Sequence, residues 1–71
     1  MATITTATTV EAVAHGKTKR YLFKFVMDNG EVHYRRAWVP DTTDEATERT
    51  ARGNLALEEL AAAEAAQLIE D

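Results

Sequence analysis

Residues 28–31, with the sequence Asp-Asn-Gly-Glu, constrain the fold of this chain more than any other feature. They separate two runs, 18–27 and 32–39, that are rich in aromatic and β-branched residues. Such residues favour strands, and Asn-Gly between two strands favours a type I′ turn because both central residues need positive φ. The sequence therefore predicts a β-hairpin over residues 18–39.

A two-residue loop at Asn29-Gly30 would also fix the register of this hairpin, since strand pairing continues outward from the turn. The aromatic residues of both strands then share one face, which we expect to form the core. This face comprises Tyr21, Phe23, Phe25, Met27, Val32, Tyr34, Arg36 and Trp38. On the other face Lys24 would lie opposite Arg35, an unfavourable pair that predicts negative charge nearby.

The N-terminal residues 1–16 are rich in threonine and contain few large apolar side chains. An alternation with a period of two residues through Ile4 and Val10 favours an edge strand over residues 3–13. Two other interpretations are open for this segment: an extended arm that orders on a partner, or a helical turn near Val13.

The C-terminal part of the chain favours a helix. Pro40 ends the second hairpin strand because it has no N–H to donate. Thr42 and Glu45 then fit a capping box, which predicts a helix over about residues 43–69. Gly53 could divide this segment into two helices, but we favour one continuous or slightly bent helix.

Together these elements predict one α+β domain over residues 1–71, a small antiparallel sheet with the helix packed on its aromatic face. The expected helix has two apolar faces, and one of them covers the sheet. The other face has nothing left to contact in so short a chain, so we expect it to form an oligomer interface. The residues of this second face are Leu55, Ala62, Ala66 and Ile69. A solvent-exposed, alanine-rich face is the alternative.

The composition also favours association. Alanine supplies 13 of the 32 apolar residues, so few large side chains are available for a core. Small domains usually need a disulfide, a metal or association for stability. The chain has no cysteine, which excludes disulfides, and a zinc site built on His15 and His33 would be unusual. Association with other copies or with a larger protein is the remaining expectation.

Catalysis is not expected from this sequence. With neither cysteine nor serine, the chain has no thiol or serine hydroxyl to act as a nucleophile. No spacing of carboxylates or histidines indicates a cofactor or metal site, and so small a core leaves little room for a small-molecule cavity. No stretch approaches the roughly 20 apolar residues of a membrane span.

The net charge of −4 conceals two opposed blocks. Residues 17–36 carry a balance of +4, whereas residues 37–71 carry −7. Basic residues interleaved with aromatic ones are typical of nucleic-acid binding. The candidate contacts for an anion or a nucleic acid are Lys19, Arg20, Lys24, Arg35 and Arg36. Against this interpretation, the acidic block would repel a polyanion, and the aromatic residues are expected in the core.

Three functional hypotheses follow from these patterns. The leading one is a non-enzymatic assembly or protein-binding module that self-associates through its C-terminal helix, of the kind found among phage or prophage structural and accessory proteins. One alternative is a nucleic-acid-binding module that uses the basic hairpin, and another is an inhibitor that docks on a larger host protein. The expected location is the cytoplasm, or a virion if the chain is phage-derived.

Overall fold

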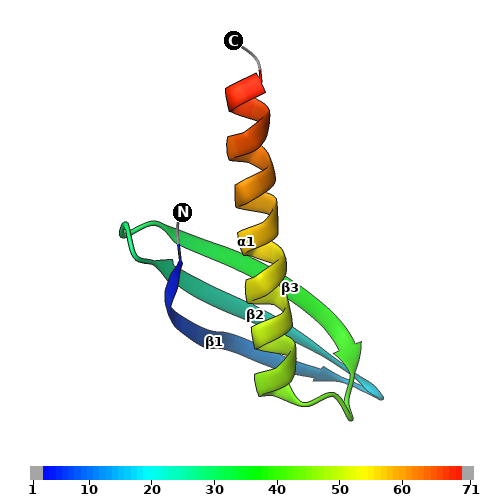
Figure 1. The fold of residues 1–71 in the computed structure, drawn as a ribbon. Helices are drawn as coiled ribbons and strands as arrows, with labels where there is room; N and C mark the ends of the chain where they lie inside the picture. Colours follow the sequence, from blue (N-terminus) through cyan, green and yellow to red (C-terminus); the bar gives the residue numbers. More distant parts are fainter. Residues whose placement is uncertain (1–2, 70–71) are drawn as a thin grey trace.

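The computed structural model describes the backbone of residues 3–69 and the side chains of residues 3–64. The fold is α+β, a three-stranded antiparallel sheet followed by one helix that packs on it, which confirms the predicted class. The elements are β1 (Ile4–His15), β2 (Thr18–Met27), β3 (Val32–Pro40) and α1 (Glu45–Ile69) (Figure 1).

The sheet has the order β1-β2-β3, so β2 is central and β1 and β3 are its edges. A third strand is present at Ile4–His15, close to the predicted residues 3–13, and the helical turn near Val13 is wrong. β1 pairs with β2 from Ile4 opposite Met27 to His15 opposite Thr18. Two shifts of register, near Thr5 and Val10, interrupt this pairing. Such bulges bend an edge strand and increase its twist.

The hairpin between β2 and β3 has a longer loop than the predicted two residues. The Gly30 N–H donates a hydrogen bond to the Met27 carbonyl at 3.0 Å, and the Met27 N–H donates to the Glu31 carbonyl at 2.8 Å. Gly30 has a φ of +88°, whereas no non-glycine residue in the described chain has a positive φ. The predicted type I′ turn is therefore wrong, because that turn needs positive φ at Asn29 as well. A turn followed by a left-handed glycine is instead typical of three-residue loops.

The extra loop residue shifts the pairing of β3 with β2 by one position, so each β3 side chain lies on the opposite face of the sheet from the predicted one. The β2 half of the predicted core is confirmed, since Tyr21, Phe23, Phe25 and Met27 are all buried. The β3 half is wrong, because the strand directs Ala37 and Val39 toward the helix instead of its aromatic residues. The β3 residues that lie on the far side of the sheet are Val32, Tyr34, Arg36 and Trp38. A one-residue shift has this effect because successive side chains of a strand point to opposite faces.

A different cap from the predicted one starts α1. Both the backbone N–H and the hydroxyl of Thr47 donate to Asp44 Oδ2, at 3.0 and 2.8 Å. The N-cap is therefore Asp44, and the predicted capping box of Thr42 and Glu45 is wrong. Both hydrogen bonds lower the pKa of Asp44 below its ordinary value of 3.8, and the one from the Thr47 hydroxyl has the larger effect. The helix continues through Gly53 without a break, as predicted.

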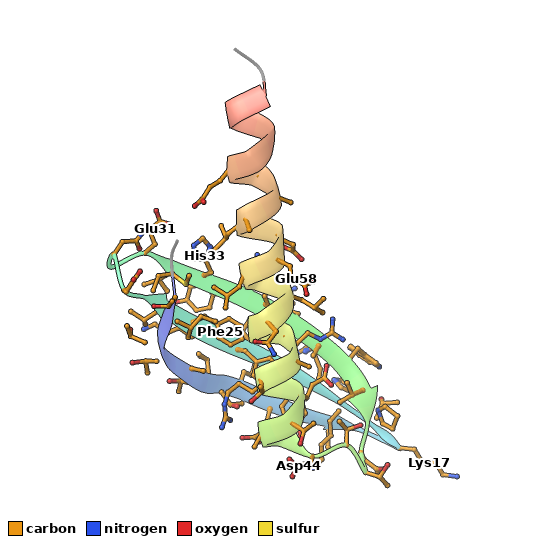
Figure 2. The ribbon with its side chains drawn as sticks, in the orientation of Figure 1. Lys17, Phe25, Glu31, His33, Asp44 and Glu58 are labelled. Carbon is orange, nitrogen blue, oxygen red and sulfur yellow. The ribbon has the colours of Figure 1, made fainter. Side chains whose placement is uncertain are left out.

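Gly53 lies where the helix packs tightly on the sheet. It is buried, and a Cβ added to it would lie 3.2 Å from both Ile4 Cδ1 and Phe25 Cε1. Figure 2 shows Phe25 between the sheet and the helix. Glycine at position 53 therefore allows the helix backbone to rest directly on the core.

A second contact joins the start of α1 to β1. The Thr9 hydroxyl donates to Glu45 and accepts a hydrogen bond from Arg49.

Candidate functional site

One face of the sheet lies away from α1, and we call it the outer face. The register assigns to it the residues that alternate with the buried ones on each strand. These are Thr6, Thr8, Glu11, Val13 and His15 of β1, Arg20, Leu22, Lys24 and Val26 of β2, and Val32, Tyr34, Arg36 and Trp38 of β3. The helix crosses only the opposite side of the sheet, so the outer face is open (Figure 1).

The largest side chains of the outer face are exposed aromatic residues. Trp38 is 58% exposed and Tyr34 is 52% exposed, although a ring of that size usually buries most of its surface in a folded domain. Val32, on the same strand, is also exposed. Large side chains exposed together on an open face of the sheet make this face a candidate interaction surface.

Cations alternate with these aromatic residues across the two strands. Arg20 lies directly opposite Trp38, and Lys24 lies directly opposite Tyr34. Arg36 occupies the β3 position between the two rings. Each exposed ring thus has a cation beside it on the neighbouring strand, and a third cation lies between the rings.

The positive charge of the outer face is only partly neutralised. Glu11 accepts a hydrogen bond from Arg20 at 3.1 Å, in an ion pair whose two side chains are about half exposed. Lys24 and Arg36 add two further positive charges. A shallow hollow of about 250 Å³ lies on this face, lined by Glu11, Arg20, Tyr21, Leu22 and Arg36. Two guanidinium groups and the Glu11 carboxylate therefore border one hollow, and Arg36 is the cation there that is not paired with Glu11.

The ring of Trp38 is supported from one side. The imidazole of His15 stacks on it, with 5.1 Å between the ring centroids and an interplanar angle of 21°. His15 ends β1, where the Thr18 hydroxyl donates to its carbonyl at 2.9 Å. The turn that follows contains Gly16 with a φ of +61°, and Lys17 lies at its tip (Figure 2). The stack leaves more than half of Trp38 open to solvent.

The structure divides the five predicted anion contacts between the two faces of the sheet. Arg20, Lys24 and Arg36 lie on the outer face, as described above. Lys19 and Arg35 lie on the side that the helix covers, where Arg35 donates to Glu59 of α1 at 3.0 Å. The predicted opposition of Lys24 and Arg35 is wrong for the same reason, because the shifted register places them on opposite faces.

The predicted oligomer interface is only partly within the described side chains. Leu55 is 47% exposed and Ala62 is exposed, so both point away from the core. Ala66 and Ile69 lie outside the residues whose side chains the structure describes. Figure 1 shows that the C-terminal part of α1 extends beyond the sheet. Leu57 and Leu60, on the other face of the helix, are half-buried against the sheet side.

The two histidines do not form a common site. His15 stacks on Trp38, whereas His33 lies near the other end of the sheet, with its Nε2 atom 3.1 Å from a Glu31 carboxylate oxygen. Among the described residues, no three histidine, aspartate or glutamate side chains come together as metal ligands.

Sequence reasoning identified the cations of the outer face but missed its aromatic residues. It assigned Tyr34 and Trp38 to the core, and it gave His15 no role. The signal that would have placed them was the loop length, because a three-residue loop closing on Gly30 brings the alternate set of β3 residues outward.

No protein-family model, curated protein or solved structure matches this chain. In the part of the chain that the structure describes, no helix combines the length and the apolar character that crossing a bilayer requires.

Proposed function

We propose that this protein is a non-enzymatic binding module that binds nucleic acid through its outer face. The observation that carries the proposal is the alternation of exposed rings and cations: Trp38 beside Arg20, Tyr34 beside Lys24, and Arg36 between them. Cations neutralise phosphates, and exposed rings stack on bases. Residues suited to both kinds of contact lie together on this one surface.

The position of the acidic residues supports this proposal despite the net charge of −4. The acidic helix lies on the other side of the sheet from the outer face, and screening at physiological salt acts over about 8 Å. Three of its carboxylates are also partly neutralised, since Glu45, Glu48 and Glu59 pair with arginines. The charge that a phosphate meets on the outer face is therefore set by the local residues, which are Arg20, Lys24, Arg36 and the paired Glu11.

Arg35 and Arg36 offer a matched test, because they are neighbours that point to opposite faces of the sheet. Arg36→Gln and Arg35→Gln change the net charge equally. Binding of fluorescently labelled DNA and RNA oligonucleotides is measured by anisotropy between about 50 and 200 mM salt. We expect Arg36→Gln to weaken binding and to flatten the salt dependence, by about 0.7 to 0.9 in the log–log slope.

The Arg35→Gln variant should bind like the unmodified chain in the same titration. Equal losses in both variants would show a non-specific effect of charge and would contradict binding by the outer face. If no oligonucleotide binds at the lowest salt, the nucleic-acid proposal is wrong. The composition of the face, rich in Trp, Tyr and Arg, would then fit a protein partner better.

A second candidate function is self-association through α1, in an assembly or accessory protein. Its support is the exposure of Leu55 on a helix that extends beyond its sheet. Size-exclusion chromatography with light scattering should then show a mass above that of a monomer, reduced to the monomer by Leu55→Glu. A monomer at high micromolar concentration, unchanged by this substitution, would exclude self-association through Leu55. For either function we propose the location expected from the sequence, which is the cytoplasm, or a virion if the chain is phage-derived.

A further inference from the structure

We infer that the outer face binds single-stranded nucleic acid in preference to duplex, with Trp38 and Tyr34 as stacking platforms and His15 as a positioning residue for Trp38. The inference rests on the proposed function and adds the form of the nucleic acid to it. Three features of the sheet support it: its width, the spacing of the two rings, and the stack of His15 on Trp38.

The width of the sheet argues against reading a duplex. β2 is paired on both sides along its length, from Thr18 between His15 and Pro40 to Val26 between Thr6 and Val32. The sheet is therefore three strands wide throughout, with no two-stranded ribbon projecting from it. The major groove is about 12 Å wide and admits a helix or a two-stranded ribbon. Three strands about 4.8 Å apart, with their side chains, are wider than that groove.

If a duplex meets the outer face through its phosphates, its bases stay inside the double helix. The two exposed rings would then contact no base, and only the cations would contribute to binding. In a single strand the bases are free to stack on aromatic side chains, and each stacked base contributes substantially to affinity. The exposure of Trp38 and Tyr34 therefore has a use with a single strand that it lacks with a duplex.

The spacing of the rings fits a short single strand that runs along β3. Trp38 and Tyr34 are four positions apart on the strand, or about 14 Å at 3.4 Å per residue. Bases that stack on protein rings leave the stack of their own strand, so a few nucleotides of a splayed single strand span this distance. Arg36 lies between the rings, and Arg20 and Lys24 lie beside them on β2. A short single-stranded segment could thus place bases on both rings and phosphates on the cations.

The His15 stack prepares Trp38 for this contact. One side of the indole is occupied by the imidazole, with the centroids 5.1 Å apart, while the residue remains more than half exposed. A ring already held in place loses less conformational freedom when a base stacks on its open side. His15 thereby acts through Trp38 rather than through the nucleic acid.

Trp38 is the only tryptophan of the chain, so its fluorescence reports directly on the contact. The full chain is titrated at low salt with oligothymidine and, separately, with the oligothymidine–oligoadenine duplex of the same length. We expect tighter binding of the single strand, together with quenching of Trp38 emission. Trp38→Ala, followed by anisotropy, should weaken single-strand binding by about 5- to 150-fold, the range that one base–aromatic stack represents. Trp38→Phe should retain much of the affinity.

The positioning role of His15 is tested with His15→Ala and the conservative His15→Phe. We expect His15→Ala to weaken single-strand binding and to alter the emission of free Trp38. The His15→Phe variant should restore both properties, because its ring can stack in place of the imidazole. Circular dichroism on each variant establishes that the fold is retained, which is expected for substitutions at exposed positions. Unchanged emission and unchanged binding in His15→Ala would overturn the positioning role.

The outcomes separate the inference from the proposed function. Duplex binding that equals or exceeds single-strand binding, with no quenching of Trp38, would overturn the single-strand inference and leave nucleic-acid binding in place. A Trp38→Ala variant that binds the single strand as well as the unmodified chain would also overturn the inference. Failure of both nucleic acids to bind at low salt would overturn the proposed function itself, and the inference with it.

Discussion

Gly53→Ala tests how closely α1 rests on the sheet. In the interior of an exposed helix this substitution stabilises a protein by about 1 kcal/mol, because alanine favours the helical backbone. At Gly53 the new methyl group would lie 3.2 Å from Ile4 Cδ1 and Phe25 Cε1. Phe25 is fully buried, so either its ring or the helix would have to shift by a few tenths of an ångström.

The two effects oppose each other, and the steric one should prevail. Inserting a methyl group into a well-packed region costs about 1 to 3 kcal/mol. After the gain in helix propensity, we expect Gly53→Ala to lower the free energy of unfolding by about 1 kcal/mol. In a domain of this size that loss corresponds to a Tm lower by about 4 to 8 °C. Urea denaturation followed by circular dichroism measures it, with a midpoint shift of about 1 M.

Asn54→Ala is the matched control, since Asn54 is the exposed neighbour of Gly53 on the same helix. It should show the propensity gain without the steric cost, and so stabilise the chain slightly. Ile4→Val removes Cδ1, one of the two close atoms, and should be less harmful in the Gly53→Ala background than alone. If Gly53→Ala is as stabilising as Asn54→Ala, the close approach of helix and sheet does not exist.

Three further predictions concern the core, the turn and the cap. Phe23→Ala should cost about 3 to 5 kcal/mol and leave so small a domain largely unfolded by circular dichroism. Gly30→Ala should cost about 1 to 2 kcal/mol in a thermal melt, since Gly30 has a φ of +88°; an unchanged Tm would contradict the three-residue loop. The pKa of Asp44 is lower in the folded chain than its ordinary value of 3.8. The ionised carboxylate therefore stabilises the fold fully at pH values above 3.8, and this stabilisation is lost as the pH falls through the pKa of the folded state. Asp44→Asn should therefore be less stable than the unmodified chain at neutral pH. The difference between their urea midpoints should become smaller in acid. A difference that does not change with pH would contradict a charged cap at Asp44.

The elements of this fold could be predicted from the sequence because their signals are local. The aromatic and β-branched runs on either side of residues 28–31 specify a hairpin, and the helix formers after Pro40 specify a helix. The core side of β2 could also be predicted, since Tyr21, Phe23, Phe25 and Met27 alternate with smaller or polar residues.

The register of β3 could not be predicted from the same local signals. Residues 28–31 fit both a two-residue and a three-residue loop. Both loops need positive φ at Gly30, and they differ in the backbone conformation of Asp28 and Asn29. The pattern of β3 favoured the wrong loop, because it places valine, tyrosine and tryptophan on one face and Arg35 with Ala37 on the other. Apolar content alone assigned the aromatic face to the core.

The error in the register has a direct consequence for the candidate site. Its cations were visible in the sequence as a charged block, but which of them share a face depends on the register of β3. Arg35 and Arg36 are adjacent residues of the same type, so the sequence alone does not distinguish them. The length of the loop at Gly30 places Arg36 on the outer face. The rings of Tyr34 and Trp38 were missed for the same physical reason.

The bulges of β1 restrict how copies of this protein can join. A free sheet edge is a template for adding strands from other molecules, and repeated addition gives fibres. The irregular pairing near Thr5 and Val10 twists the β1 edge and makes it a poor template. The β3 edge carries Arg35 and Arg36 at its middle, so a second β3 aligned against it would bring like charges together. Continuous growth by edge-to-edge stacking is thus disfavoured at both edges, and any ordered assembly has to form through the outer face or the helix.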